Sequence, residues 1–465
     1  MKKLLTQLAF VYGLFVMVWC SSCANIIPPS GGPRDSLPPM LVLAQPKDSA
    51  LNVKSNKIQL TFNEFVEVKD IQQNLVVLPN PKNQPVIDYK LHNVYIRLKD
   101  SLEPNTTYTL QFGNALRDVN ESNIARNFSY VFATGNRLHN GRLTGSVQLA
   151  QTGKTDSTLI AVLHANLNDT AIQKIRPRYY AKLNGKGLYE FVHLMPGQYR
   201  LFVLPNDYSK KYDDSTKLFA FADSTINISD ELPQQAPVLY AYQEAKKKDN
   251  PTTARTKSTE EKQLKYSLQL DNGQQDILKP ELAMVFNRKV QWTDTLGIVL
   301  CDTLYRPLSN SRWTLDSTRT TFIVQHAWKA GAVYKLIVSK KAVTDTLKNT
   351  LAKTDTVSFT AKKESDYGSV QLNFKGLALD KHPVLCIIEG DKLKEAIPLS
   401  QTRFYRKLFK PGDYELSILY DANKNGVWDA GQFRSKRQPE KVTAIPQKLT
   451  VKPNWDNEVD YELTN

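Results

Sequence analysis

Short runs in which apolar and polar residues alternate are the feature of this chain that most limits its fold. In residues 40–135, apolar side chains take every second position of four such runs. These positions are Ile58, Leu60 and Phe62; Val94, Ile96 and Leu98; Tyr108, Leu110 and Phe112; and Phe128, Tyr130 and Phe132. A period of two buries one face of a strand and leaves the other in water. The pattern therefore predicts an all-β fold made of half-buried strands.

Turn-forming residues separate the runs. Pro79-Asn80-Pro81 precedes one run and Pro104-Asn105 precedes another. Proline and asparagine suit turns because proline presets the backbone angle and asparagine bonds to its own backbone. Several short strands at this spacing predict an immunoglobulin-like β-sandwich over residues 40–135.

Two groups of residues in this segment, in the right order, carry a resemblance to a known family. They are Pro46, Asp48, Ala50 and Val53 with Ile58-x-Leu60-x-Phe62-x-Glu64-x-Val66, and then Leu102-x-Pro104-x-x-x-Tyr108, Asp118-x-Asn120 and Phe132-x-Thr134. They resemble the two ends of an SbsA-type bacterial Ig-like domain. The resemblance implies a structural sandwich of an exported protein, with no catalytic residues to carry over.

A second type of unit follows over residues 140–242. It contains Gly145-Ser-Val147 and Gly187-Leu-Tyr-Glu-Phe191, and it closes with Leu194-Met-Pro196-Gly197-Gln-Tyr199-Arg-Leu201. A strand, a Pro-Gly turn and a Tyr-x-Leu strand in this order resemble the transthyretin-like or carboxypeptidase-regulatory-like sandwich. Residues 243–263 are then charged and almost free of apolar side chains, which predicts a flexible linker.

After the linker the same order repeats. In residues 264–362, Leu282, Met284 and Phe286 mirror the first run, and Trp328-Lys-Ala-Gly331 replaces the Pro-Asn turn. In residues 366–465, Pro411-Gly412-x-Tyr414-x-Leu416 mirrors the turn at Pro196. We therefore predict tandem β-sandwich domains, an Ig-like and transthyretin-like pair repeated twice, with the second Ig-like copy diverged.

The N-terminus reads as an export signal. Lys2 and Lys3 precede an apolar run of about 12 residues, too short to span a bilayer, which needs about 20. Small residues then lead to Cys23, which resembles the lipobox of bacterial lipoproteins, although Trp19-Cys20 departs from that pattern and makes Cys20 the competing site. The prediction is a cleaved signal peptide over residues 1–22 and an acylated Cys23, with palmitate among its chains. Residues 23–39, rich in proline and glycine, form a tether.

The start Cys23-Ala-Asn…Pro-Pro-Ser-Gly-Gly-Pro-Arg-Asp35 and the ending Lys436-Arg-Gln-Pro-Glu440…Asn454-Trp-Asp456 resemble Ig-like-domain lipoproteins of the Bacteroidota. The resemblance implies a lipid anchor in the outer membrane. Surface-exported lipoproteins of such bacteria usually carry acidic residues just after the cysteine, and residues 24–27 have none. The expected address is therefore the periplasmic face of the outer membrane.

Composition and motifs narrow the function classes. The net charge of +15 comes from scattered basic residues without a nucleic-acid motif, so no nucleic-acid partner is expected. The six histidines are far apart, and no nucleophile motif or phosphate-binding loop occurs, so we expect no enzyme. Cys301 and Cys386 each lie inside an apolar run and are expected to be buried free thiols.

One loop has the spacing of a calcium site. Oxygen-bearing side chains occupy positions 1, 3, 5 and 9 of a loop with glycine at position 6, and the residues are Asp421, Asn423, Asn425, Gly426 and Asp429. The carbonyl of Val427 would be the seventh-position ligand, but position 12 is Gln432 instead of glutamate. The alternative is a hairpin turn whose side chains bond their own backbone. Calcium is thus the one cofactor that the sequence suggests.

Two functions are compatible with these predictions. The first is a structural or protein-interaction module of the cell envelope, held on the bilayer through Cys23 and presenting its sandwiches to an unknown envelope protein. The second is a glycan-binding lipoprotein, for which Tyr179, Tyr180, Trp428 and Trp455 are the candidate aromatic face. Aromatic side chains at strand spacing also suit a hydrophobic core, so the sequence leaves both readings of these residues open.

Overall fold

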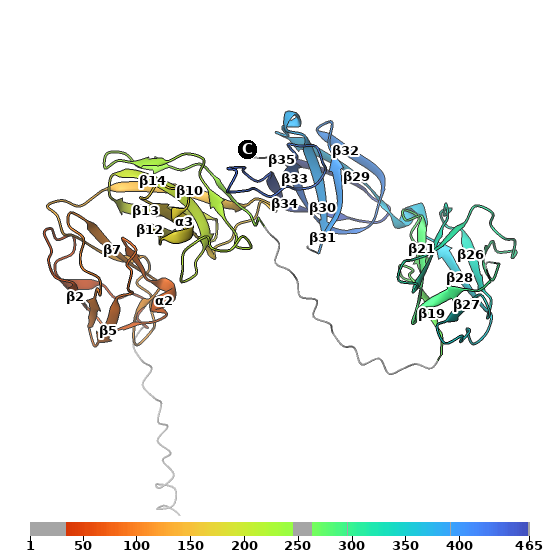
Figure 1. Cartoon of the computed structure of the whole chain (residues 1–465), viewed down its shortest axis with the longest axis horizontal. Helices are drawn as coiled ribbons and strands as arrows, with labels where there is room; N and C mark the ends of the chain where they lie inside the picture. Colours follow the sequence, from red (N-terminus) through yellow and green to blue (C-terminus); the bar gives the residue numbers. More distant parts are fainter. Residues whose placement is uncertain (1–33, 245–262, 295, 391, 464–465) are drawn as a thin grey trace, which may run out of the picture. The chain divides into compact units, whose positions relative to one another are not determined.

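The computed structural model describes residues 34–244, 263–294, 296–390 and 392–463 (Figure 1). The predicted signal peptide, Cys23, most of the tether and most of the linker lie outside the described residues. The chain divides into two compact units. Of the described residues, the first unit holds those up to Arg142 with Val192–Pro196 and Ser229–Leu232. The second holds Leu143–Phe191, Gly197–Ile228 and the described residues from Pro233 onward.

The first Ig-like sandwich has two main sheets. One has the order β1-β2-β6-β5 and the other the order β4-β7-β9, with a short β3-β8 pair beside them. The bounds are β1 Leu41–Gln45, β2 Lys57–Phe62, β3 Val66–Val68, β4 Val76–Leu78, β5 Val86–Lys90, β6 Asn93–Arg97, β7 Thr107–Gly113, β8 Leu116–Asp118 and β9 Phe128–Ala133, with a short helix α2 at Ile71–Asn74. The alternating residues of β2, β6 and β7 form its core, which confirms the predicted strand pattern.

The third sandwich repeats this topology. Its sheets have the orders β19-β21-β25-β24 and β20-β28-β26-β23, with a β22-β27 pair beside them. The bounds are β19 Tyr266–Leu268, β20 Gln274–Gln275, β21 Glu281–Phe286, β22 Val290–Trp292, β23 Ile298–Cys301, β24 Arg312–Leu315, β25 Thr321–Gln325, β26 Val333–Val338, β27 Val343–Asp345 and β28 Asp355–Ala361. A tyrosine hydroxyl accepts the backbone N–H five residues earlier in both copies, Tyr108 from Glu103 at 2.7 Å and Tyr334 from Lys329 at 2.8 Å. The two sandwiches therefore share this tyrosine hydrogen bond, although the sequences of the turns before the tyrosines differ.

The second sandwich has a different topology. One sheet has the order β13-β10-β17, with β18 also on β10, and the other has the order β12-β11-β14-β15, with β16 also on β14. The bounds are β10 Gly141–Leu149, β11 Leu159–His164, β12 Tyr179–Lys182, β13 Leu188–Leu194, β14 Gly197–Pro205, β15 Ala220–Phe221, β16 Ile226–Ile228, β17 Gln234–Gln235 and β18 Leu239–Ala241, with helix α3 at Ala171–Lys174.

The fourth sandwich repeats the topology of the second. Its sheets have the orders β32-β29-β35 and β31-β30-β33-β34. The bounds are β29 Gly368–Lys375, β30 Pro383–Glu389, β31 Lys392–Pro398, β32 Arg403–Phe409, β33 Gly412–Tyr420, β34 Lys441–Val451 and β35 Asp456–Glu462, with 3-10 turns at Glu364–Asp366 and Leu379–Lys381. In each copy the last strands, β17 and β18 or β35, run parallel to the first. The chain is therefore an all-β tandem of repeated β-sandwiches.

The Pro-Gly turns begin equivalent strands in these two sandwiches. Gly197 opens β14 and Gly412 opens β33, with φ angles of 153° and 155° that side chains rarely adopt. Two residues later, Tyr199 and Tyr414 are buried in their cores.

The described residues contain no helix long and apolar enough to cross a membrane. Cys301 and Cys386 are both free and buried, as expected. Burial raises the pKa of both thiols, so both are poor nucleophiles.

Candidate functional site

The predicted calcium loop lies between β33 and β34 and begins with a buried carboxylate. Asp421 is 2 % exposed, and its two carboxylate oxygens accept the backbone N–H groups of Asn425 at 3.2 Å and Gly426 at 2.7 Å. Gly426 has φ +75°, which is the left-handed conformation that the sharp turn requires.

The other predicted ligands bond to one another. The side-chain amides of Asn423 and Asn425 both donate to one oxygen of Asp429, at 2.6 and 2.7 Å. Their side-chain oxygens accept backbone N–H groups, Asn423 from Asn425 at 3.0 Å and Asn425 from Val427 at 2.7 Å. The structure thus brings all five predicted residues into one loop and gives every predicted ligand side chain a hydrogen-bond partner within it.

Sequence reasoning missed one member of this loop. Glu440 receives the N–H of Ala422 at 2.9 Å on one oxygen and the N–H of Asp429 at 3.0 Å on the other, and its carbonyl accepts the Trp428 indole N–H at 2.9 Å. It lies 11 residues beyond Asp429, outside any calcium-loop spacing, so the loop motif does not include it. Across the described ranges, no group of three or more His, Cys, Asp or Glu side chains is placed to hold a metal. Calcium binding by this loop stays a prediction.

The segment between β33 and β34 also contains Phe433, whose side chain packs against the second sandwich. Phe433 is only 6 % exposed, and its ring lies against four aromatic rings of that sandwich. The ring centroids are 5.8 Å from Phe202, 6.3 Å from Tyr212, 5.0 Å from Phe219 and 5.3 Å from Phe221. Edge-on contacts of this kind add to the gain from burial. We call this set of five rings the Phe433 contact; it lies wholly within the second compact unit.

Polar bonds surround the Phe433 contact. The N–H of Phe433 donates to a carboxylate oxygen of Glu244 at 2.5 Å. The Lys436 ammonium lies 4.2 Å from the Phe433 ring centroid and pairs with Asp169 at 2.7 Å. The Gln438 amide donates to the Phe221 carbonyl at 3.1 Å. The second and fourth sandwiches are therefore joined by an apolar plug with bonded polar edges, although about 200 residues separate them in sequence.

The candidate aromatic face does not assemble. Tyr179 and Tyr180 are buried in the second sandwich, and Trp428 is half-buried with its indole N–H bonded to the Glu440 carbonyl. Trp455 is 61 % exposed, and the Lys452 ammonium lies 4.8 Å from its ring centroid. The two tyrosines are adjacent on β12 and so point to opposite faces of its sheet, and both faces are covered. The Tyr179 ring packs edge-on against Tyr199 at 5.8 Å, and the Lys210 ammonium lies 4.8 Å from the Tyr180 ring centroid.

His164 is the deepest of the described histidines. It is 1 % exposed on β11, and burial lowers its pKa to about 4, so the ring is neutral at pH 7. Phe202 packs edge-on against it at 5.8 Å. This environment is that of a core residue.

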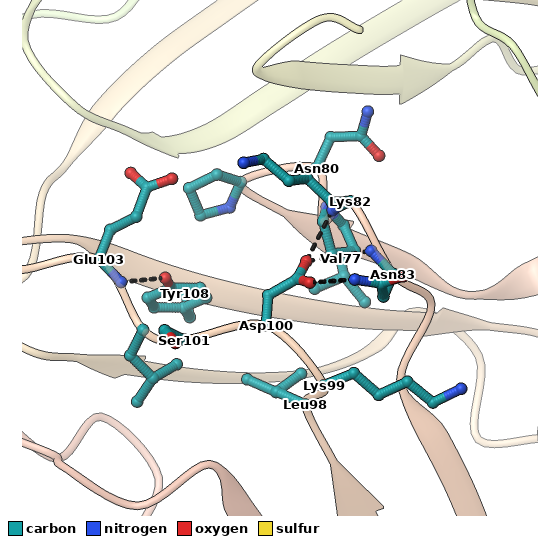
Figure 2. A pocket seen from close by; sticks show the side chains of 13 residues that line it. Val77, Asn80, Lys82, Asn83, Leu98, Lys99, Asp100, Ser101, Glu103 and Tyr108 are labelled. Carbon is teal, nitrogen blue, oxygen red and sulfur yellow. Dashed lines mark hydrogen bonds between the residues drawn. The ribbon is translucent and has the colours of Figure 1, made fainter.

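The first sandwich contains a hollow of about 340 Å³ between the turn after β4 and the segment that follows β6 (Figure 2). Asp100 holds its wall in place by accepting the N–H of Lys82 at 2.7 Å and the N–H and side-chain amide of Asn83 at 3.1 and 2.7 Å. Burial acts to raise the pKa of Asp100, but the bonds from Asn83 and Lys82 outweigh burial and lower the pKa. A carboxylate held in this way is structural, because its oxygens are bonded to the turn after β4.

Comparison with known proteins finds one family match. The description of the matching family is bacterial Ig-like domain, and the match covers residues 35–134. That range coincides with the first sandwich and leaves most of the chain outside it. No curated protein matches the chain.

The solved structures that match this chain include a pilin subunit, the TIE protein and an S-layer protein. The major pilin subunit BcpA of Bacillus cereus is 9% identical, with 70% of this chain and 99% of that chain covered and a TM-score of 0.18. The TIE protein of Bacillus anthracis is 10% identical over 94% of this chain and 76% of that one, with a TM-score of 0.16. The S-layer protein rSbsC is 10% identical over 91% and 54%, with a TM-score of 0.16. At these TM-scores the assignment of the fold rests on the family match and on the sheet topology.

Proposed function

We propose that this protein is a lipid-anchored module of a bacterial cell envelope that acts by presenting rigid β-sandwiches to a partner, without catalysis. The observation that carries the proposal is the Phe433 contact, which joins two sandwiches remote in sequence into one compact unit. Bacterial Ig-like domains fit a structural or interaction role. Because the Phe433 contact holds two sandwiches together, it can keep their exposed surfaces in a fixed arrangement for a partner.

The proposed anchor is an acylated Cys23, supported by the short apolar run and small residues before it. Each buried methylene adds about 0.8 kcal/mol of membrane affinity, so two or more chains hold a protein firmly. The proposed address is the periplasmic face of the outer membrane. The resemblance to Bacteroidota lipoproteins supports the membrane, and the absence of acidic residues at positions 24–27 supports the periplasmic face.

The anchor is tested by labelling cells with an alkyne analogue of palmitate. The wild-type chain and Cys20→Ser should both carry label and fractionate with membranes, whereas Cys23→Ser should lose the label and become soluble. Equal labelling of Cys23→Ser would overturn the choice of cysteine. Protease added to intact cells should leave the chain uncut if it faces the periplasm, and cleavage would place it on the cell surface.

The interaction role is tested by cross-linking in envelopes. The wild-type chain should give a discrete cross-linked envelope protein. Phe433→Ala should reduce that product, because the sandwiches would no longer be held together. A wild-type chain that yields no cross-linked protein would count against this role and favour the glycan-binding alternative.

A further inference from the structure

A shallow hollow of about 560 Å³ lies on the outward face of the first sandwich, over β2, β5 and β6. Its size falls within the range of small-ligand sites, about 300–1,000 Å³. Its lining includes Lys57, Gln59, Tyr95 and Arg97, whose side chains alternate with those of the core residues Ile58 and Ile96. These side chains are therefore free of any role in the core of this sandwich.

Two cations face each other in this hollow. Lys57 on β2 lies directly opposite Arg97 on β6, and both side chains are exposed. Like charges directly opposite on neighbouring strands destabilise a sheet. In the described residues, neither cation has a carboxylate within ion-pair distance. The Lys57–Arg97 pair destabilises the sheet and has no carboxylate in the described part of the chain to neutralise it, so the two cations are suited to bind an anion.

An exposed aromatic ring and amides form the next row of the same face. Gln45, Gln59, Tyr95 and Asp88 lie opposite one another across the four strands. Tyr95 is 41 % exposed and lies one position along its strand face from Arg97. The Gln59 amide donates to the Asn93 side-chain oxygen at 3.2 Å, which holds it beside the ring. Amides and a carboxylate offer donors and acceptors to hydroxyl groups, while the ring offers an apolar face.

We propose that this hollow binds an acidic polysaccharide, with a sugar ring on Tyr95, hydroxyl groups on Gln45, Gln59 and Asp88, and a carboxylate on Lys57 and Arg97. Arginine and lysine form charge-assisted bonds to carboxylates, and arginine can do so with two parallel bonds. A nucleic-acid strand would need a series of aromatic platforms along a basic groove, and this hollow has a single ring. The inference does not depend on the anchor at Cys23 or on the Phe433 contact.

The test is equilibrium binding of the full chain, purified in detergent, to immobilised polygalacturonate. Neutral dextran and linear polyphosphate serve as the uncharged and the sugar-free probes. Wild-type protein should bind polygalacturonate more tightly than either, and added salt should weaken the binding because it screens the cations. Tyr95→Ala should weaken it by about tenfold, the effect of losing one stacking contact. The double variant Lys57→Gln/Arg97→Gln should weaken it by more, because it removes two charge-assisted contacts.

The matched controls are Tyr89→Ala and Lys90→Gln, which change exposed residues of β5 outside the hollow. Both should bind like the wild type. The thermal midpoints of the single variants should match that of the wild type, because each changed side chain is on the surface. The midpoint of the double variant should be equal or higher, because it removes two like charges that face each other. Absence of binding to polygalacturonate, equal loss in the control variants, or equally tight binding of polyphosphate that survives Tyr95→Ala would overturn the proposal. None of these outcomes bears on acylation, which the palmitate labelling reads independently.

Discussion

Replacing Phe433 by alanine should separate the second and fourth sandwiches. The side chain is 6 % exposed and is surrounded by four aromatic rings, so its removal leaves a cavity that the edges of two domains must close. Truncation of a buried phenylalanine to alanine costs about 3–5 kcal/mol. Each aromatic pair adds about 0.5–1.5 kcal/mol beyond burial, which favours the upper half of that range. We expect a loss of about 4 kcal/mol in coupling between the sandwiches.

The assay is denaturant unfolding of the full chain in detergent, followed by hydrogen exchange at β14, β15 and β34. In the wild type these strands should exchange together. In Phe433→Ala the unfolding should split into two transitions, and exchange in β15 should rise while the core of the fourth sandwich stays protected. Val427→Ala is the matched control, because it shortens a side chain in the same loop that is 64 % exposed. A single unchanged transition, or a loss below about 1 kcal/mol, would refute the reasoning.

Three further predictions follow from buried polar groups. Burial lowers the pKa of His164 to about 4, so between pH 6.5 and 4 the unfolded state binds a proton that the folded state does not. The free energy of unfolding should therefore fall by about 3 kcal/mol across that window. In His164→Leu the denaturant midpoint should depend less on pH over the same range. The side-chain hydrogen bond from Asn349, together with that from Arg288, lowers the pKa of Asp345 to about 2. Its contribution to the stability of the third sandwich is present above about pH 4 and is lost as the pH falls toward 2. Asp345→Asn should remove this acid sensitivity in thermal melts. Asp421→Ala should destabilise the fourth sandwich by about 1–3 kcal/mol even with a chelator present, since two N–H groups lose their acceptor, whereas a loss seen only when calcium is present would favour the metal site.

Local pattern accounts for the strands and for much of the core. Ile58, Leu60 and Phe62 are all buried on β2, and the equivalent positions of β21 show the same alternation. The reason is geometric, since successive side chains of a strand point to opposite faces whatever the rest of the chain does. The Pro-Gly turns could also be predicted from the sequence, because the backbone angles at Gly197 and Gly412 are ones that residues other than glycine rarely adopt.

The residues of the Asp421 loop could be predicted from the sequence only in part. Asn423 and Asn425 bond to Asp429, and Asp421 bonds to backbone N–H groups of the same loop, whereas convergence of these side chains on a calcium ion stays a prediction. Glu440 was not predictable, because its contribution depends on where β34 begins in space and on no fixed interval along the chain. A local turn can be read from local sequence, but a partner brought back by the following strand cannot.

The sequence by itself determined the class of fold and the repetition of two sandwich types, because each follows from periodicity or from a backbone preference that acts within a few residues. Only the tertiary structure decided which surfaces meet. Phe433 reads in the sequence as an isolated aromatic residue in a polar loop, and its role appears when the fourth sandwich places that loop over the rings of the second. Lys57 and Arg97 likewise become neighbours only through strand pairing. Contacts between residues far apart in sequence depend on the register and docking of whole elements, and no local pattern encodes them.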